Sequence, residues 1–291
     1  MWTGELRVRV PSVTHMKKIN NGNLKLAIQK QGRLTEETLE FLRKSGLEFE
    51  SYRKKLFSLC RNFPLEILYV RNDDISDYVS SGIVDLGIVG QNTLYEERPK
   101  VRKLLNLRFG FCSLFIAVPK ESSVKSIIDL QGKVVATSYP ESTKKFFEKN
   151  RIKVNIFKIN GSVELAPALG VAEAIVDLVS TGSTLALNDL RMLTKIYDSE
   201  AVLIANNETV VDNKLLLRFQ SVLSAKSYKS VLMDIPPAVL PKIKKLVPGL
   251  KNYLFSTHVV IKEDVLWELV GKFKELGVSK IIVMPIEKMI I

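Results

Sequence analysis

Residues 174–187, AIVDLVSTGSTLAL, form the segment of the chain best suited to chemistry. The apolar run predicts a buried strand that ends at Val179, and a polar stretch, residues 180–184, follows it. A glycine-containing turn between a strand and a helix directs backbone N–H groups and hydroxyls toward one point, at the positive end of a helix dipole. Two interpretations follow: a phosphate site, or an ordinary turn whose hydroxyls cap a helix. Asp177 could there accept a hydrogen bond from a ribose hydroxyl or help to hold a magnesium-bound ligand.

Charged residues also gather at two other predicted strand ends. Arg71 ends one predicted strand, and Asp73 begins the helix that follows. Lys30 and Arg33 come directly after the predicted strand 24–29. Both clusters suit phosphate or ribose, but helix capping and a solvated loop explain the same residues.

Several chemistries lack the residues they require. The chain has two histidines, His15 and His258, and neither lies in the central part, so no Ser–His or Cys–His pair can act there. Cys60 and Cys112 are too few for a disulfide framework or a zinc cluster. No G-x-G-x-x-G follows the first strand and no G-x-x-x-x-G-K-[ST] occurs, which argues against dinucleotide and P-loop sites.

Strands alternate with helices from residue 24 onward, which predicts an α/β protein. The expected strands are 24–29, 66–71, 84–89, 115–118, 133–136, 155–159 and 174–179, and the expected helices are 35–46 (with Thr35 as N-cap), 73–81 and 141–150. The tetrapeptide IVDL occurs at 83–86 and 175–178, and after three intervening residues each copy is followed by a glycine, Gly90 or Gly182, which suggests two similar lobes facing a cleft. After residue 214 the pattern changes to that of a small α+β module.

Composition and charge limit the function classes. A chain of 291 residues with 46% hydrophobic and 25% charged residues is typical of a folded protein of two or three domains. No apolar run reaches the roughly 18 residues of a membrane span, and the start lacks a secretory signal, so we expect a cytoplasmic protein without a membrane partner. The net charge of +12 divides into +3 on 1–23, +2 on 24–213 and +7 on 214–291, so it indicates a basic surface rather than a nucleic-acid partner.

Six motifs carry a resemblance to a known family. They are LAIQKQGRL (26–34), VRNDDI (70–75), VDLGIVGQN (84–92), ATSYP (136–140), NGSVELAP (160–167) and DLVSTGSTL (177–185). In this order they resemble the ATP phosphoribosyltransferase family, and residues 265–289 resemble the C-terminal module of its long, histidine-sensing form. The resemblance covers about residues 24–291.

The resemblance implies a fold and a reaction. The fold is α/β, with two periplasmic-binding-protein-like lobes around a cleft and a C-terminal ferredoxin-like α+β regulatory domain. The implied boundaries are 1–23 for a leader outside the family, 24–109 with 193–216 for lobe I, 110–192 for lobe II and 217–291 for the regulatory domain. The reaction joins N1 of the adenine of ATP to C1′ of phosphoribosyl pyrophosphate and releases pyrophosphate, with Mg2+. Dimers that assemble into a homohexamer and inhibition by histidine are implied as well.

Site residues follow from the matching positions. The catalytic candidates are Asp177, Glu164, Arg71 and Lys30. The substrate-binding candidates are Arg33, Asp73, Asp85, Tyr139, Glu173, Ser180, Thr181, Gly182, Ser183 and Thr184. The allosteric candidates are Asp234, Leu250, Ser256 and Thr257, and no magnesium ligand is assigned. Four residues depart from the family pattern: Gln91 stands where glutamate is usual, Ser113 where arginine is usual, and Asn72 and Glu173 where aspartate is commoner.

The alternatives have different requirements. A non-catalytic small-molecule binding protein of the same two-lobed fold would be expected to carry an export signal. A ligand-sensing half of a transcription regulator would need a helix-turn-helix, which residues 1–23 cannot supply.

Overall fold

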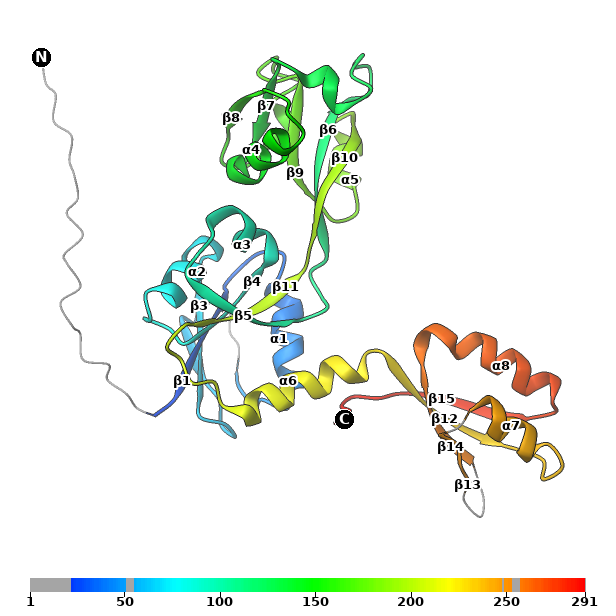
Figure 1. Ribbon diagram of the computed structural model, residues 1–291. Helices are drawn as coiled ribbons and strands as arrows, with labels where there is room; N and C mark the ends of the chain where they lie inside the picture. Colours follow the sequence, from blue (N-terminus) through cyan, green and yellow to red (C-terminus); the bar gives the residue numbers. More distant parts are fainter. Residues whose placement is uncertain (1–21, 51–54, 248, 253–256, 291) are drawn as a thin grey trace, which may run out of the picture.

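The computed structural model describes residues 22–50, 55–247, 249–252 and 257–290 (Figure 1). These residues form two α/β lobes and a smaller C-terminal α+β module. All but the last two residues of the expected leader lie outside the described part. No helix of the described residues combines the length and apolarity needed to cross a membrane.

The sheet of lobe I, in its described part, has six strands in the order β2-β3-β1-β4-β11-β5. They are β1 (Leu24–Gln29), β2 (Phe57–Leu59), β3 (Leu65–Val70), β4 (Leu86–Gly90), β5 (Val101–Asn106) and β11 (Ala201–Asn206). The helices of this lobe are α1 (Thr35–Lys44), α2 (Asn72–Ser80), α3 (Gln91–Glu97) and α6 (Asn213–Ala225). β1, β3 and β4 are parallel, while β11 returns from the other lobe and runs antiparallel between β4 and β5.

Lobe II repeats this plan with the order β10-β6-β9-β7-β8. Its strands are β6 (Cys112–Pro119), β7 (Val134–Thr137), β8 (Asn155–Lys158), β9 (Ala174–Val179) and β10 (Leu190–Ser199), and its helices include α4 (Pro140–Lys149) and α5 (Ser183–Leu187). β7, β8 and β9 are parallel, and β6, which arrives from lobe I, lies antiparallel between β9 and β10. The two connections, β5 to β6 and β10 to β11, join the lobes (Figure 1). The paired lobes of periplasmic binding proteins have this architecture, as expected.

Strand pairing moves one expected boundary. The chain was expected to return to lobe I at residue 193, but β10 pairs with β6 as far as Ser199, which lies opposite Cys112. The return therefore falls at Glu200, directly before β11. Sequence alone did not predict β2, β5, β10 or β11, although residues 201–205 are a clear apolar run.

Packing moves the other boundary. α6 places Leu215 and Phe219 in the core of lobe I, where the Phe219 ring lies 5.1 Å from the ring of Phe41 on α1. Because these side chains are fully buried there, α6 is part of lobe I. The regulatory domain, expected to begin at residue 217, therefore begins after this helix.

The C-terminal module is a four-stranded antiparallel sheet in its described part, with the order β13-β14-β12-β15. Its elements are β12 (Tyr228–Asp234), α7 (Leu240–Leu246), β13 (Lys251–Asn252), β14 (Thr257–Lys262), α8 (Leu266–Glu275) and β15 (Ser279–Pro285). The βαββαβ succession in this order is the ferredoxin-like fold. Its core includes Val231, Val259 and Phe273.

One local prediction is wrong. Thr35 was expected to cap α1, but Leu34 occupies the N-cap position, and the Thr35 hydroxyl donates instead to the carbonyl of Gln29 at 3.2 Å. The hydroxyl thereby ties the helix to the end of β1, next to the loop that carries Lys30 and Arg33.

Candidate active site

The site of lobe I forms where its parallel strands end. Lys30 directly follows β1 and Arg71 directly follows β3, and the Lys30 N–H donates to the carbonyl of Val70 at 2.8 Å. The two cations therefore lie at neighbouring strand ends, as expected. Asp73, in the first turn of α2, lines the cleft between the lobes.

The site of lobe II is a pocket of about 140 Å³ at the end of β9. It is lined by Glu164, Asp177, Leu178, Val179, Ser180, Thr181, Gly182, Thr184 and Leu185. Gly182 adopts a φ of +80°, a left-handed conformation that glycine accepts without strain, directly before α5. The hydroxyls of Thr181 and Ser183 lie 2.9 Å apart. Six predicted site residues thus line one hollow: Glu164, Asp177, Ser180, Thr181, Gly182 and Thr184. A seventh, Ser183, is hydrogen-bonded to Thr181.

Burial dominates the electrostatics of this pocket. It raises the pKa of Asp177 to about 6, and the nearby charge of Glu164 raises that pKa as well. The Leu178 N–H donates to the Asp177 carboxylate at 2.8 Å and has the opposite effect. A hydroxyl or cation that a ligand brings to such a buried carboxylate stabilises its charged form, which favours binding of that ligand.

Tyr139 connects the two lobes electrostatically. Burial raises its pKa, the charges of Asp177 and the Tyr197 phenol also raise it, and the Arg33 guanidinium lowers it. Arg33 of lobe I and Asp177 of lobe II therefore both act on this one phenol. Arg33 also donates to the carbonyl of Gly110 at 2.5 Å, in the connection between the lobes.

A cleft of about 830 Å³ lies between the lobes. Lobe I contributes Asn72, Asp73, Asn92, Thr93, Glu96 and Glu97, and lobe II contributes Ser138, Tyr139, Pro140, Glu141, Lys158, Asn160 and Gly161. Of these, only Asp73 and Tyr139 were predicted as site residues. Ser138 could have been found, because it lies within the ATSYP motif; Glu96 and Lys158 carried no sequence signal.

Two predicted substrate-binding residues lie away from the cleft. The carboxylate of Asp85 accepts a hydrogen bond from the Lys25 N–H at 2.9 Å, near the start of β1. The carboxylate of Glu173 accepts one from the Val134 N–H at 2.8 Å, at the start of β7. Both therefore lie at the amino ends of the parallel strands, the opposite edge from Lys30 and Asp177. Their position gives them a structural task, to satisfy the first N–H groups of neighbouring strands.

The two copies of the IVDL tetrapeptide lie at different places along their strands. Asp85 precedes β4, whereas Asp177 is the fourth residue of β9, so the two aspartates are not equivalent. Gly90 and Gly182 each directly precede a helix, α3 or α5, but Gly90 is the extended last residue of β4, whereas Gly182 lies three residues beyond β9 with a φ of +80°. The repeat therefore locates a strand followed by a helix in each lobe, but the strand begins after the aspartate in lobe I and before it in lobe II.

Two of the departures from the family pattern, Gln91 and Ser113, have partners in the protein. Gln91 begins α3 and its amide donates to the Tyr95 hydroxyl. Ser113 donates to Asp198 at 2.6 Å, and Lys195 pairs with the same carboxylate at 3.0 Å. These bonds lower the pKa of Asp198.

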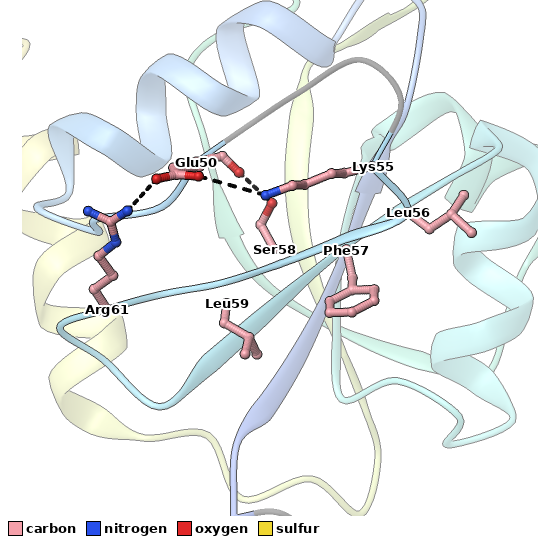
Figure 2. A pocket seen from close by; sticks show the side chains of 7 residues that line it. All are labelled: Glu50, Lys55, Leu56, Phe57, Ser58, Leu59 and Arg61. Atoms are coloured by element: carbon pink, nitrogen blue, oxygen red, sulfur yellow. Dashed lines mark hydrogen bonds and ion pairs between the residues drawn. The ribbon is translucent and has the colours of Figure 1, made fainter.

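Another hollow, of about 440 Å³, follows the outer edge strand β2 (Figure 2). Glu50 pairs there with Lys55, at 3.8 Å, and with Arg61, while Phe57 and Leu59 point away from that ion-pair cluster. None of the described residues that line it was predicted as a site residue.

The described allosteric candidates gather at one end of the C-terminal sheet. Asp234 ends β12, Thr257 begins β14 opposite Met233, and Leu250 directly precedes β13. Asp234 pairs with Lys280 at 3.7 Å, Thr257 is buried, and Leu250 packs on the core. Ser256 lies outside the described residues.

Comparison with known proteins gives consistent matches. The family model of ATP phosphoribosyltransferase matches residues 71–225, and the model of the HisG C-terminal domain matches residues 225–288. The ATP phosphoribosyltransferase of Cytophaga hutchinsonii is 40% identical, over 92% of this chain and 98% of its own length. That of Parabacteroides distasonis is 38% identical, over 92% of this chain and 100% of its own length. A solved ATP phosphoribosyl transferase (HisG:HisZ) complex from Thermotoga maritima contains a chain with 29% identity and a TM-score of 0.57, covering 68% of this chain and 98% of that one.

Fold, cleft and relatives together define a phosphoribosyltransferase, built from two α/β lobes and a ferredoxin-like module. The chain belongs to the ATP phosphoribosyltransferase family, whose reaction is the first step of histidine biosynthesis. This agrees with the resemblance seen in the sequence motifs. Enzymes of this family generally need a divalent metal ion.

Proposed function

We propose that phosphoribosyl pyrophosphate binds with its 5-phosphate on the turn of residues 180–184 and that ATP enters the cleft between the lobes. The observation that carries this proposal is the lobe II pocket, whose lining combines three hydroxyl residues, Ser180, Thr181 and Thr184, with the acidic residues Glu164 and Asp177. Phosphate suits the turn, and the carboxylates suit ribose hydroxyls. Lys30, Arg71 and Arg33 supply the cations of lobe I for pyrophosphate and ATP.

The reaction needs charge stabilisation more than a nucleophilic side chain. The C1′–oxygen bond to pyrophosphate breaks, a bond from N1 of adenine to C1′ forms, and the electron pair of the broken bond leaves with pyrophosphate. Positive charge develops on the sugar, so Asp177 and Glu164 stabilise it through the ribose hydroxyls, while the lobe I cations stabilise the leaving group. Asp85 and Glu173 take no part in this scheme, because they lie at the opposite edge of the sheets.

The proposed metal is Mg2+, bound together with the pyrophosphate. Among the described residues, no group of three or more His, Cys, Asp or Glu side chains could hold a metal by itself. Mg2+ commonly takes one or two carboxylates plus substrate phosphates. Asp177 and Glu164 fit this donor set, because both are carboxylates that repel each other and a cation between them would relieve that repulsion. When bound, the ion would neutralise charge on the pyrophosphate.

Replacement of Thr184 by alanine tests the phosphate turn. We expect the KM for phosphoribosyl pyrophosphate to rise by about 10- to 150-fold, because one hydroxyl hydrogen bond to a charged group contributes about 1.5–3 kcal/mol. The KM for ATP should change little. The assay follows formation of phosphoribosyl-ATP, with Thr209→Ala, in the loop before α6, as the matched control. An unchanged KM in Thr184→Ala would refute the assignment of the turn.

We also propose that histidine inhibits the enzyme by binding at the end of the C-terminal sheet near Asp234 and Thr257. The support is the family to which residues 225–288 belong and the convergence of these two residues. Titration of histidine against the initial rate should give inhibition that Asp234→Asn weakens. No binding and no inhibition at millimolar histidine would overturn it. A dimer that assembles into a homohexamer and a location in the cytoplasm stay predictions from the family.

A further inference from the structure

The two lobes touch through α3 of lobe I and α4 of lobe II. Glu96, in the last turn of α3, is half-buried at this contact and also lines the cleft. Its two carboxylate oxygens accept hydrogen bonds from different residues of the opposite lobe, one from the Glu141 N–H at 2.8 Å and one from the Ser142 N–H at 2.9 Å.

These two N–H groups are the ones that an N-cap normally satisfies. α4 begins with Pro140, which has no N–H, and its N-cap residue, Tyr139, forms no side-chain capping bond. The next two residues are Glu141 and Ser142. Glu96 therefore caps α4 from the other lobe, and its negative charge lies at the positive end of the α4 dipole.

A second contact reinforces the first. The ring of Tyr95, which precedes Glu96, meets the ring of Tyr197 on β10 edge-on, with 4.7 Å between centroids. The Tyr197 hydroxyl lies 3.2 Å from the hydroxyl of Ser142. Two neighbouring residues of α3 thus bind two elements of lobe II, which fixes the distance and the orientation between the lobes at this point.

The contact lies next to the proposed catalytic groups. Tyr139 is the residue directly before α4, and its carbonyl accepts hydrogen bonds from the N–H and hydroxyl of Thr143. The first turn of α4 therefore holds Tyr139 in place, two residues after Thr137 of β7, which pairs with Val176, the neighbour of Asp177 on β9. Because Glu96 fixes the position of α4 against lobe I, it also sets how far Tyr139 and Asp177 of lobe II lie from Arg33 of lobe I.

We propose that Glu96 is a positioning residue for phosphoribosyl transfer: it caps α4 across the cleft and holds the lobes at the separation that the reaction needs. This proposal rests on the cleft being the catalytic site. It also means that the amino end of α4 is closed to substrate phosphates, which leaves the turn of residues 180–184 as the open anion site of lobe II. The Glu96 carboxylate itself does not touch the reacting atoms.

The test compares Glu96→Ala and Glu96→Gln with Glu148→Ala, which removes an exposed carboxylate from the last turn of α4, the helix that Glu96 caps. Kinetics of the full-length chain give kcat and KM, and hydrogen–deuterium exchange reports on the peptide that contains residues 141–143. We expect Glu96→Ala to lower kcat about tenfold and to expose the amides of Glu141 and Ser142 to exchange. Glu96→Gln should recover part of both effects, because its amide oxygen can still accept one of the two bonds. Glu148→Ala should behave like the unaltered enzyme.

Two outcomes overturn the proposal. One is an unchanged kcat in Glu96→Ala despite faster exchange at α4, which would show a cap of purely structural value. The other is unchanged exchange, which would show that Glu96 does not cap α4 in solution. Thr184→Ala run beside these variants separates this proposal from the assignment of the phosphate turn: if Glu96→Ala loses activity and Thr184→Ala keeps its KM, the turn assignment fails while the role of Glu96 stands.

Discussion

Replacing Asp177 by asparagine should nearly abolish phosphoribosyl transfer and at the same time make the protein more stable. The loss of activity follows from the proposed role, because the carboxylate stabilises charge that develops on the sugar. Removal of one such preorganised group lowers kcat by about 100- to 1,000-fold in well-studied enzymes. The gain in stability follows from burial, which holds the pKa of Asp177 at about 6, above its ordinary 3.8.

The destabilisation caused by the buried Asp177 carboxylate depends on pH. Well below pH 3.8 the carboxyl is protonated in both the folded and the unfolded chain, so it imposes no electrostatic penalty. Between about pH 4 and 6 the unfolded chain loses this proton more readily than the folded one, and the free energy of unfolding of the native sequence falls. Above about pH 6 the full penalty applies, about 1–3 kcal/mol at 1.36 kcal/mol per pKa unit after allowance for screening. Asparagine does not ionise, so the variant escapes the penalty.

Thermal or chemical unfolding of both chains in metal-free buffer at pH 4 and pH 7.5 measures this difference. The gain of Asp177→Asn should be fully present at pH 7.5 and only a small fraction of that at pH 4. Asp189→Asn is the matched control, because Asp189 is an exposed aspartate of the same lobe, paired with Lys120 at the surface. Equal stability of Asp177→Asn and the native chain at both pH values, or retention of activity, would contradict the prediction.

Phe219→Ala should lower the stability of lobe I by about 3–5 kcal/mol, the usual cost of emptying a fully buried phenylalanine site. Phe219 is completely buried, and its ring packs 5.1 Å from that of Phe41. The damage should appear in lobe I, because α6 packs there and not in the C-terminal module.

Native-state hydrogen exchange on the whole chain distinguishes the two regions. Amides of β1 and β4 should exchange faster in Phe219→Ala, while those of β12 and β14 keep their protection. Leu217→Ala, on the exposed side of the same helix, should cost no more than about 0.5 kcal/mol. Loss of protection confined to β12 and β14 would show instead that α6 belongs to the regulatory module, as the boundary at residue 217 implied.

The sequence by itself determined the local features of this protein. The apolar run before Ser180, with Gly182 in the turn, predicts a strand, a turn and a helix without reference to any distant residue, and β9 and α5 have these places. The same holds for Lys30 and Arg71, since each directly follows an apolar run that forms a parallel strand. The six motifs in order were enough to identify the family, because each lies within one loop and its flanking element.

Tertiary structure decided which carboxylates reach the cleft. Asp85 and Asp177 share the tetrapeptide IVDL, but whether such a residue lies at the amino or the carboxyl end of a strand depends on where pairing with the neighbouring strand begins. That register is set by contacts with residues far away in the sequence, as for Asp85 with Lys25 and Glu173 with Val134. The capping of α4 by Glu96 is of the same kind. Helix caps are normally supplied by the adjacent residue, and only the approach of two lobes brings this carboxylate to a helix that begins 44 residues later.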